Sequence, residues 1–154
     1  MLSNLFSENY GIWETTGKRV KLSSSRFKEL HQLDTVVYML SPEDDILGFL
    51  TYDETGLINC LVVREDYRRK QIASTLVEWM YLYSNNPVSI ITRNPISIHI
   101  LERCNKVLEH ERINSNFPVS QKGLPENMLK KCETKYGKLK KGEEWRIKIK
   151  RERN

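Results

Sequence analysis

Several features that would assign this chain to a familiar class are missing from its 154 residues. No apolar run approaches the roughly 20 residues that a membrane-spanning helix needs. The N-terminal stretch MLSNLFSENYGIW lacks the cationic and apolar regions of a secretory signal. The three cysteines, Cys60, Cys104 and Cys132, form no CxxC pair, so we expect reduced thiols. These absences predict a cytoplasmic protein without a membrane partner.

Motifs for nucleotides and metals are also absent. The chain contains neither GxxxxGK[ST] nor GxGxxG, which excludes a Walker loop and a dinucleotide-binding fingerprint. His31, His99 and His110 show no metal-ligand spacing. Cys104 and His110 lie on either side of a predicted helix end, and neither has a second ligand at the spacing that a zinc site requires. We therefore expect no metal site.

Charge is unevenly distributed along the chain. Residues 1–101 hold 10 Lys/Arg and 12 Asp/Glu, whereas residues 102–154 hold 15 and 8, so balances of −2 and +7 make up the net charge of +5. A basic C-terminal third predicts a local patch that faces an anionic partner, although surface charge that serves only solubility would give the same count.

The hydrophobic pattern predicts an α/β domain. Strands are expected at 18–22, 35–40, 46–52, 57–63, 88–92, 106–113 and 143–152, and helices at 23–33, 72–83, 94–104 and near 125–136. The run 57–63 is apolar at nearly every position, as in a strand covered on both faces, and the apolar residues of 72–83, Trp79 included, are expected in the core. The strand–helix–strand order over 57–92 predicts a parallel pair joined by a right-handed crossover.

The strand at 57–63 is followed by a turn with three consecutive cations, Arg68, Arg69 and Lys70, and then by a helix. The N-terminus of a helix presents unpaired backbone N–H groups and the positive end of the helix dipole. A solvated turn is the ordinary interpretation of such a charge run. Three cations at a helix N-terminus favour a site for phosphate.

The segment VVREDYRRKQIAS resembles the pyrophosphate loop of the GNAT superfamily of acyl-CoA N-acyltransferases, whose pattern is Arg/Gln-x-x-Gly-x-Gly/Ala. Arg68, Gln71 and Ala73 occupy the patterned positions. TRNPISIHILERCNK is similar to the family's next element, in which an Asn precedes a helix with a small residue three positions on, here Asn94 and Ser97. The motif-level resemblance covers residues 57–106.

The resemblance implies a GNAT-like fold: one domain over 1–154 with a mixed, mostly antiparallel central sheet flanked by helices, and a basic insertion at 114–141 before the last strand. It implies an acetyl-CoA-dependent N-acyltransferase in which an amine attacks the thioester directly in a ternary complex. The implied residues that bind the cosubstrate are Leu61, Val62, Val63, Arg68, Arg69, Lys70, Gln71, Ile72, Ala73, Ser74, Asn94 and Ser97. A backbone N–H near Leu61 or Val63 would stabilise the oxyanion.

The sequence departs from the family pattern in four places. Gln71 stands where the family has Gly, and we expect it to serve there only with a negative φ. Leu101 replaces the usual Tyr that protonates the leaving thiolate, and Asn105 replaces a Gly. The strand at 57–63 has no carboxylate to act as a base. His99 and Glu102 are the remaining candidates for an acid near the thioester, and orientation of the reactants supplies much of the acceleration in any case.

The acceptor is expected to be an amine on a macromolecule. Only about a dozen residues separate the first two predicted strands, which leaves the acceptor side open. The 114–141 insertion adds Lys122, Lys130, Lys131, Lys135, Lys138, Lys140 and Lys141. An acidic protein would suit this surface. A nucleic acid, as a modified base or charged tRNA, is the alternative, with Tyr136 and Trp145 available for stacking. A catalytically silent protein that binds CoA or a partner is the other alternative.

Overall fold

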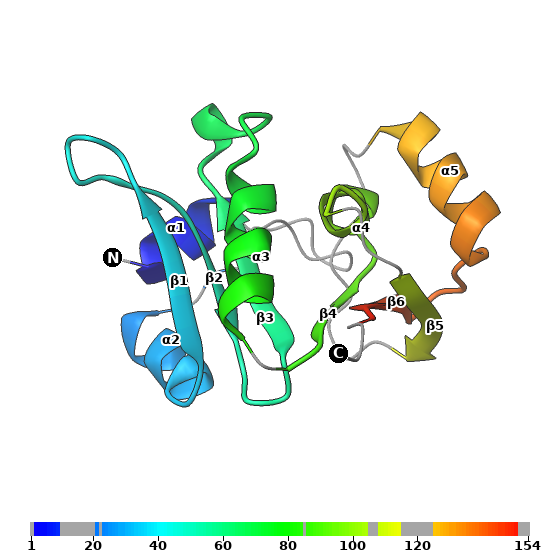
Figure 1. The fold of residues 1–154 in the computed structure, drawn as a ribbon, viewed down its shortest axis with the longest axis horizontal. Helices are drawn as coiled ribbons and strands as arrows, with labels where there is room; N and C mark the ends of the chain where they lie inside the picture. The colour runs from blue at the N-terminus through cyan, green and yellow to red at the C-terminus, as the bar shows by residue number, and fades with distance from the viewer. Residues whose placement is uncertain are drawn as a thin grey trace.

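The computed structural model describes residues 2–9, 21, 23–84, 86–104, 108–114 and 125–150. Its elements are, in order, α1 (Leu2–Asn9), α2 (Ser24–His31), β1 (Thr35–Leu40), β2 (Ile46–Tyr52), β3 (Leu57–Val63), a 3-10 helix η1 (Glu65–Tyr67), α3 (Ile72–Tyr83), β4 (Val88–Thr92), α4 (Pro95–Glu102), β5 (Leu108–Asn114), α5 (Glu126–Tyr136) and β6 (Glu143–Ile149). The strands form one sheet in the order β1-β2-β3-β4-β6-β5 (Figure 1). β3 and β4 are parallel, and the other neighbours are antiparallel. The predicted mixed, mostly antiparallel sheet is confirmed.

Two hydrophobic clusters pack against opposite faces of the sheet. The larger one joins α3, α4 and α5 to one face, and it includes Leu76, Leu101 and Trp145. The smaller one joins α1 and α2 to the other face around Phe27 and Phe49. Strand alternation produces this division, because neighbouring residues such as Phe49 and Leu50 point to opposite faces. Among the described strands, β2 and β3 therefore contribute buried residues to both clusters, whereas Tyr38 and Leu40 of β1 are exposed.

Helix α3 is less completely buried than its composition predicts. Ile72, Leu76 and Met80 are buried as expected, but Trp79 and Tyr83 are 52% and 70% exposed and stack on each other. The expectation that Trp79 lies in the core is wrong. Nearly every residue of this helix is apolar, so the periodicity marks a stripe wider than the face that meets the sheet.

The strand β3 is covered on both faces only in part. Ile58, Cys60 and Val62 are buried, whereas Asn59 is exposed and Leu57, Leu61 and Val63 are half-buried. This corrects the expectation from its apolar composition. The exposed residue, Asn59, directly follows the two residues of β3 that pair with β4.

The N- and C-terminal parts differ from expectation in three respects. Helix α1, whose Ser3 and Phe6 are buried against the second cluster, has no counterpart in the prediction. Four of the five residues of the strand expected at 18–22 lie outside the described residues. Tyr136 and Trp145, which were candidates for base stacking, are 5% and 1% exposed and belong to the main core.

No helix in the described part of the chain has both the length and the hydropathy needed to cross a bilayer. Within the same ranges, no three His, Cys, Asp or Glu side chains gather in an arrangement that would hold a metal ion. Cys60, Cys104 and Cys132 are buried free thiols. Burial and the nearby Asp34 carboxylate raise the pKa of the Cys60 thiol far above its usual value, so this cysteine stays protonated.

A glycine, Gly56, allows the turn between β2 and β3 to pack closely against the start of β4. Gly56 has φ +85°, and a Cβ there would lie 1.9 Å from the carbonyl oxygen of Pro87. Gly142 has nearly the same φ, +84°, but no atom lies within 4 Å of its would-be Cβ. Substitutions at Gly56 and Gly142 can therefore distinguish two costs in stability. Gly142 reports the cost of a Cβ at a positive φ, and Gly56 reports that cost together with a steric clash.

We expect Gly142→Ala to lower the free energy of unfolding by about 1 kcal/mol, the cost of a Cβ in the left-handed region. Gly56→Ala should lower it by at least about 3 kcal/mol, because the clash forces β4 away from the turn. Urea denaturation of both variants measures the two values. Equal losses in the two proteins would contradict a tight contact between Gly56 and Pro87.

Candidate active site

The parallel strands β3 and β4 separate soon after they meet. They pair only at Leu57–Ser89 and Ile58–Ile90, near their N-terminal ends. Past that point β3 continues to pair with β2 as far as Val63, and β4 continues to pair with β6 as far as Thr92. The facing edges of β3 and β4 thus have no strand partner over the rest of their length, and the two ribbons diverge in Figure 1. An extended ligand can hydrogen-bond to such an edge as an added strand does.

A β-bulge at Asn59 marks the point where the strands part. Thr51 lies opposite Cys60 and Tyr52 lies opposite Ile58, so Asn59 is an extra residue in β3. The bulge changes the face of the following side chains: Ile58 packs in the main core, while Cys60 packs in the cluster beneath α1 and α2. Bulges bend and twist a strand, which accounts for the divergence of β3 from β4 at this position.

The loop after β3 has the backbone form of an anion-binding nest. Arg69 and Gln71 adopt left-handed conformations, with φ of 65° and 64°. Gln71 is the N-cap of α3, and no side chain caps this helix N-terminus. Within the described residues, the backbone N–H groups of residues 69–74 have no hydrogen-bond acceptor. Consecutive unpaired amides at a helix N-terminus form a concavity that suits phosphate oxygens.

The positive φ of Gln71 corrects the sequence analysis, which allowed a Gln at this position only with a negative φ. The backbone takes the form that Gly would adopt freely, and the Gln side chain tolerates it at a cost of about 1–2 kcal/mol. Gln71 is exposed, so its side chain occupies no core space. The loop therefore keeps its backbone geometry although the glycine is replaced.

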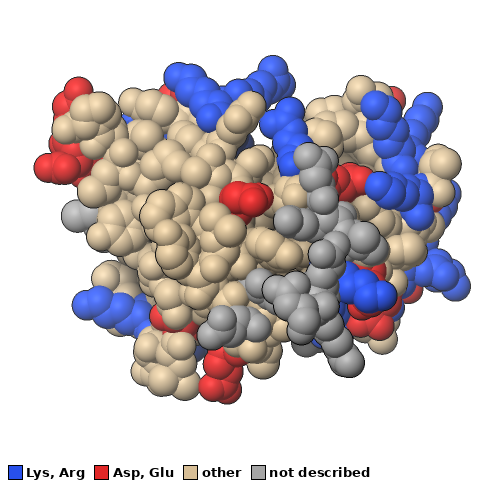
Figure 2. All heavy atoms as spheres, in the orientation of Figure 1, with Lys and Arg blue, Asp and Glu red and all other residues tan. Residues whose placement is uncertain are grey.

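Cationic side chains surround this loop and are held by local contacts. The Arg68 Nε donates to the Val63 carbonyl oxygen at 3.2 Å, which places the guanidinium at the end of β3. Lys70 and Arg64 lie over the Tyr67 ring, at 5.0 and 5.2 Å from its centroid. Tyr67 itself packs against the main core, so it anchors the loop. Figure 2 shows Lys and Arg gathered over this end of the molecule and again over α5.

Helix α4 begins beside the divergent end of β4. The Asn94 side chain caps it by accepting from the Ile96 amide at 2.9 Å, and Pro95 is its first residue. The Ser97 amide donates to the Asn94 carbonyl oxygen at 3.1 Å. The predicted cap is confirmed. The Asn94 side-chain oxygen accepts the hydrogen bond of this cap. Any contact of Asn94 with a cosubstrate would therefore use its side-chain NH₂ group or its backbone.

The candidates for acid catalysis lie further along α4. Leu101, at the usual Tyr position, is fully buried in the main core. His99 is exposed, and the Glu102 carboxylate is ion-paired with Lys135 of α5. Glu102 is thus held toward α5. The hydrogen bond to Glu102 raises the pKa of Lys135, so this lysine stays charged.

Sequence reasoning missed a polar network on the other face of the sheet, next to the bulge. The His31 Nδ1 lies 2.8 Å from the Asp34 Oδ2 and 3.2 Å from the Thr51 hydroxyl. The Asn59 side-chain amide donates to Asp34 at 3.1 Å and to Asp53 at 3.5 Å. The spacing of His31 and Asp34 at a helix end is a local signal, but only the tertiary fold brings Asn59 to them.

Comparisons with known proteins agree with this geometry. The model of the acetyltransferase (GNAT) family matches residues 1–105, more than half of the chain. A comparison with curated proteins finds no match. Among solved structures, the chain is similar to a chimera of the spermidine N-acetyltransferase SpeG from Vibrio cholerae and hSSAT, with a TM-score of 0.61 and 14% identity over 96% of this chain and 86% of that one.

Two further solved structures are similar. Mutant forms of the spermidine/spermine N-acetyltransferase SpeG from Vibrio cholerae match with a TM-score of 0.58 and 14% identity, over 96% of this chain and 85% of that one. The aminoglycoside 6'-N-acetyltransferase from Enterococcus faecium matches with a TM-score of 0.49 and 14% identity, over 99% and 91%. At these identities, the SpeG structures with TM-scores of 0.61 and 0.58 show a shared fold.

The left-handed conformation at position 71 leads to a stability prediction. Gln71→Gly should raise the free energy of unfolding by about 1 kcal/mol, because Gly adopts this φ without the Cβ clash. Gln71→Val should lower it, since a β-branched side chain tolerates a positive φ least. Urea denaturation measures both. A loss of stability in the Gly variant would show that the Gln71 side chain makes a stabilising contact.

Proposed function

Because the chain belongs to the GNAT family of acetyltransferases, we propose specific roles for its residues in the transfer of an acetyl group from acetyl-CoA to an amine. The observation that carries the proposal is the parting of β3 and β4 at Asn59, with uncapped amides at the far end of β3. The unpaired edge of β3 can bind the extended pantetheine arm of acetyl-CoA, and the uncapped amides can bind its diphosphate.

The diphosphate of acetyl-CoA binds to the loop and first turn of α3, at Arg68, Arg69, Lys70, Gln71, Ile72, Ala73 and Ser74. The support is the left-handed backbone at Arg69 and Gln71, which turns successive amides toward one concavity. Arg68 and Lys70 add positive charge there, and charge-assisted hydrogen bonds to phosphate are about twice as strong as neutral ones.

The pantetheine arm lies along the unpaired edge of β3, where it bonds to the backbone of Leu61, Val62 and Val63. The arm runs from the C-terminal end of β3 toward its junction with β4, and the thioester lies on this edge before the junction. Asn94 and Ser97, at the start of α4, border this site on the β4 side. A backbone N–H near Leu61 or Val63 donates to the carbonyl oxygen as it gains negative charge.

The chemistry is a direct transfer in a ternary complex. The neutral amine attacks the thioester carbon, the tetrahedral intermediate collapses, and CoA leaves as a thiolate. The amine loses one proton and the thiolate gains one. His99 serves as the acid for the thiolate, or water does, because Leu101 cannot and the Glu102 carboxylate is ion-paired with Lys135. Holding both reactants at this site supplies much of the rate, since orientation alone can lower a barrier by several kcal/mol.

For the acceptor, we propose an amine on a macromolecule with acidic character. Exposed lysines of α5 and the segment after it support this: Lys130, Lys131, Lys135, Lys138, Lys140 and Lys141. The SpeG structures that share the fold are named for spermidine and spermine, small amines, so small amines belong in every assay. A nucleic acid is the second candidate, favoured by the same lysines. Its binding would weaken steeply as salt rises.

The test of the cosubstrate assignment replaces the two loop cations together. The double substitution Arg68→Ala and Lys70→Ala should weaken acetyl-CoA binding at least about tenfold, because two charge-assisted contacts are lost. Isothermal titration calorimetry measures the affinity, and thiol release measures turnover with a panel of amines.

S-acetyl-pantetheine, which lacks the diphosphate, is the matched control ligand. The variant should bind and use it as well as the parent protein does. Equal affinity of both proteins for acetyl-CoA would contradict the assignment of the diphosphate to this loop. Absence of thiol release with every amine, alongside measurable CoA binding, would contradict catalysis by this chain.

A further inference from the structure

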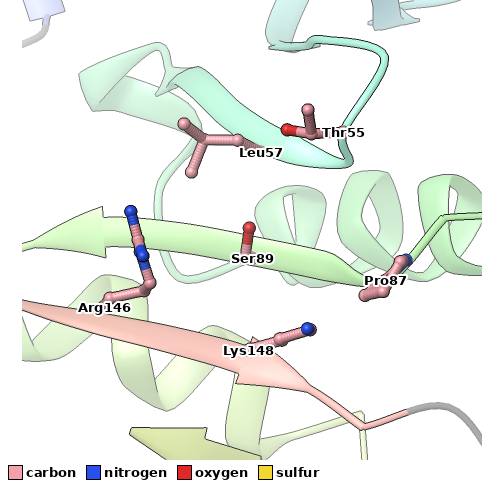
Figure 3. A pocket seen from close by; sticks show the side chains of 6 residues that line it. All are labelled: Thr55, Leu57, Pro87, Ser89, Arg146 and Lys148. Atoms are coloured by element: carbon pink, nitrogen blue, oxygen red, sulfur yellow. The ribbon is translucent and has the colours of Figure 1, made fainter. Parts of the chain in front are cut away.

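A cavity of about 250 Å³ opens at the N-terminal ends of β3 and β4 (Figure 3). Its lining consists of Thr55, Leu57, Pro87, Ser89, Arg146 and Lys148. The cavity lies on the sheet face away from α3, because the flanking residues Val88, Ile90, Ile147 and Ile149 all pack in the main core on the opposite face. This is also the face on which the Asn59 network lies.

The cavity floor is a row of side chains across three strands. Leu57 of β3 lies opposite Ser89 of β4, and Ser89 lies opposite Lys148 of β6. Residues in such register have Cβ atoms about 5 Å apart on one face. Arg146 lies two positions from Lys148 on the same strand and face. In Figure 3 the Arg146 side chain extends toward β3, and the Ser89 hydroxyl points into the space beside it.

The cavity rim is fixed by backbone contacts. The Ser89 amide donates to the Gly56 carbonyl oxygen at 3.0 Å, and the Asn86 side-chain amide donates to the Glu54 carbonyl oxygen. The Asp53 carboxylate accepts from the Thr55 and Leu57 amides at 2.9 and 3.2 Å. Partial burial raises the pKa of Asp53, but its hydrogen bonds outweigh this and lower the pKa overall, so it stays ionised. A fixed rim favours ligand binding because little ordering is needed.

The charge of the lining is positive. None of the described residues that line the cavity is acidic, and two are cations. Arg146 is ion-paired with Glu111 at 3.0 Å, on the side away from β4. Lys148 has no ion-pair partner in the described ranges, because the neighbouring Glu109 pairs with Lys150 instead, at 3.8 Å. An ammonium and a hydroxyl beside a guanidinium suit a carboxylate or a phosphate.

We propose that this cavity binds an anionic group, a carboxylate or a phosphate, on the amine acceptor; this rests on the proposed function. The diphosphate of acetyl-CoA is assigned to the C-terminal end of β3, so its thioester points toward the strand junction. The acceptor must then approach from the N-terminal side of that junction. The cavity lies there, because Leu57 and Ser89 form the first pair of the junction.

The first experiment measures kcat/KM for matched amines with and without a remote anion. The pairs are 4-aminobutyrate with 4-aminobutyramide, and 3-aminopropyl phosphate with 3-aminopropanol. The parent protein should favour the anionic member of at least one pair tenfold or more, and the pair that shows it distinguishes a carboxylate from a phosphate ligand. Equal use of both members in both pairs would overturn the proposal.

The variant Lys148→Gln should abolish the preference while the use of neutral amines changes less than twofold. Lys150→Gln is the control, because Lys150 lies two residues after Lys148, pairs with Glu109 and does not line the cavity. Acetyl-CoA affinity should be unchanged in both variants. A preference that survives Lys148→Gln, or that Lys150→Gln reduces equally, would also overturn the proposal.

The cavity can be tested even if no amine is acetylated, which separates its failure from that of the proposed function. Acetate and inorganic phosphate are titrated into the ¹⁵N-labelled protein, saturated with CoA where CoA binds. One of the anions should shift the amide signals of Ser89 and Lys148 in the parent protein and not in Lys148→Gln. No shift with either anion would refute the cavity as an anion site, whatever the outcome of the acetyl-transfer assays.

Discussion

The site depends on the short length over which β3 and β4 are paired. Two paired positions join the parallel strands, and the extra residue Asn59 then bends β3 away. A third or fourth pair would close the edge of β3, and no extended ligand could bond to it. The separation is possible because each strand keeps its outer partner, β2 for β3 and β6 for β4, so the sheet stays continuous while an internal edge is left unpaired. Unpaired strand edges are otherwise a liability for aggregation, and here the edge lies inside the sheet, where another chain has little access.

The loop that follows shows what holds a strained backbone in place. Arg69 and Gln71 both carry a Cβ at a positive φ, which Gly would adopt more easily. The surrounding contacts set this conformation: Tyr67 packs on the core, two cations lie over its ring, and Arg68 bonds back to the end of β3. With residues 67 and 72 both held against the core, the intervening chain must reverse within a few residues. The reversal turns its amides outward, toward the position proposed for the diphosphate.

Several acidic residues of the C-terminal third are paired with its cations in the fold. Strand β5 places Glu109 and Glu111 beside Lys150 and Arg146 of β6, and Glu102 of α4 meets Lys135 of α5. Exposed pairs of this kind contribute little stability. They leave the +7 balance unchanged, because each joins one cation to one anion that the balance already counts. Most described cations of this third outside these pairs are found on α5, on the segment after it and at Lys148, while Arg103 and Arg112 lie at the end of α4 and on β5. The excess charge is therefore divided between an exposed lysine surface and one cavity at the foot of the sheet, and the two would contact different parts of an acceptor.

Local patterns in the sequence determined most of the secondary structure and the family. Alternating or continuous apolar runs located β1 to β6, Asn94 and Pro95 located the start of α4, and the cations before Ile72 marked the loop. Such signals act over a few residues, so they survive in a single sequence. Tertiary structure alone decided the rest: the bulge at Asn59, the φ of Gln71, the exposure of Trp79, the burial of Tyr136 and Trp145, and the meeting of Asp34 with Asn59. Each depends on which neighbour a residue meets from a distant part of the chain. Composition cannot specify that, because an apolar helix surface or a strand edge looks the same in sequence whether or not another element covers it.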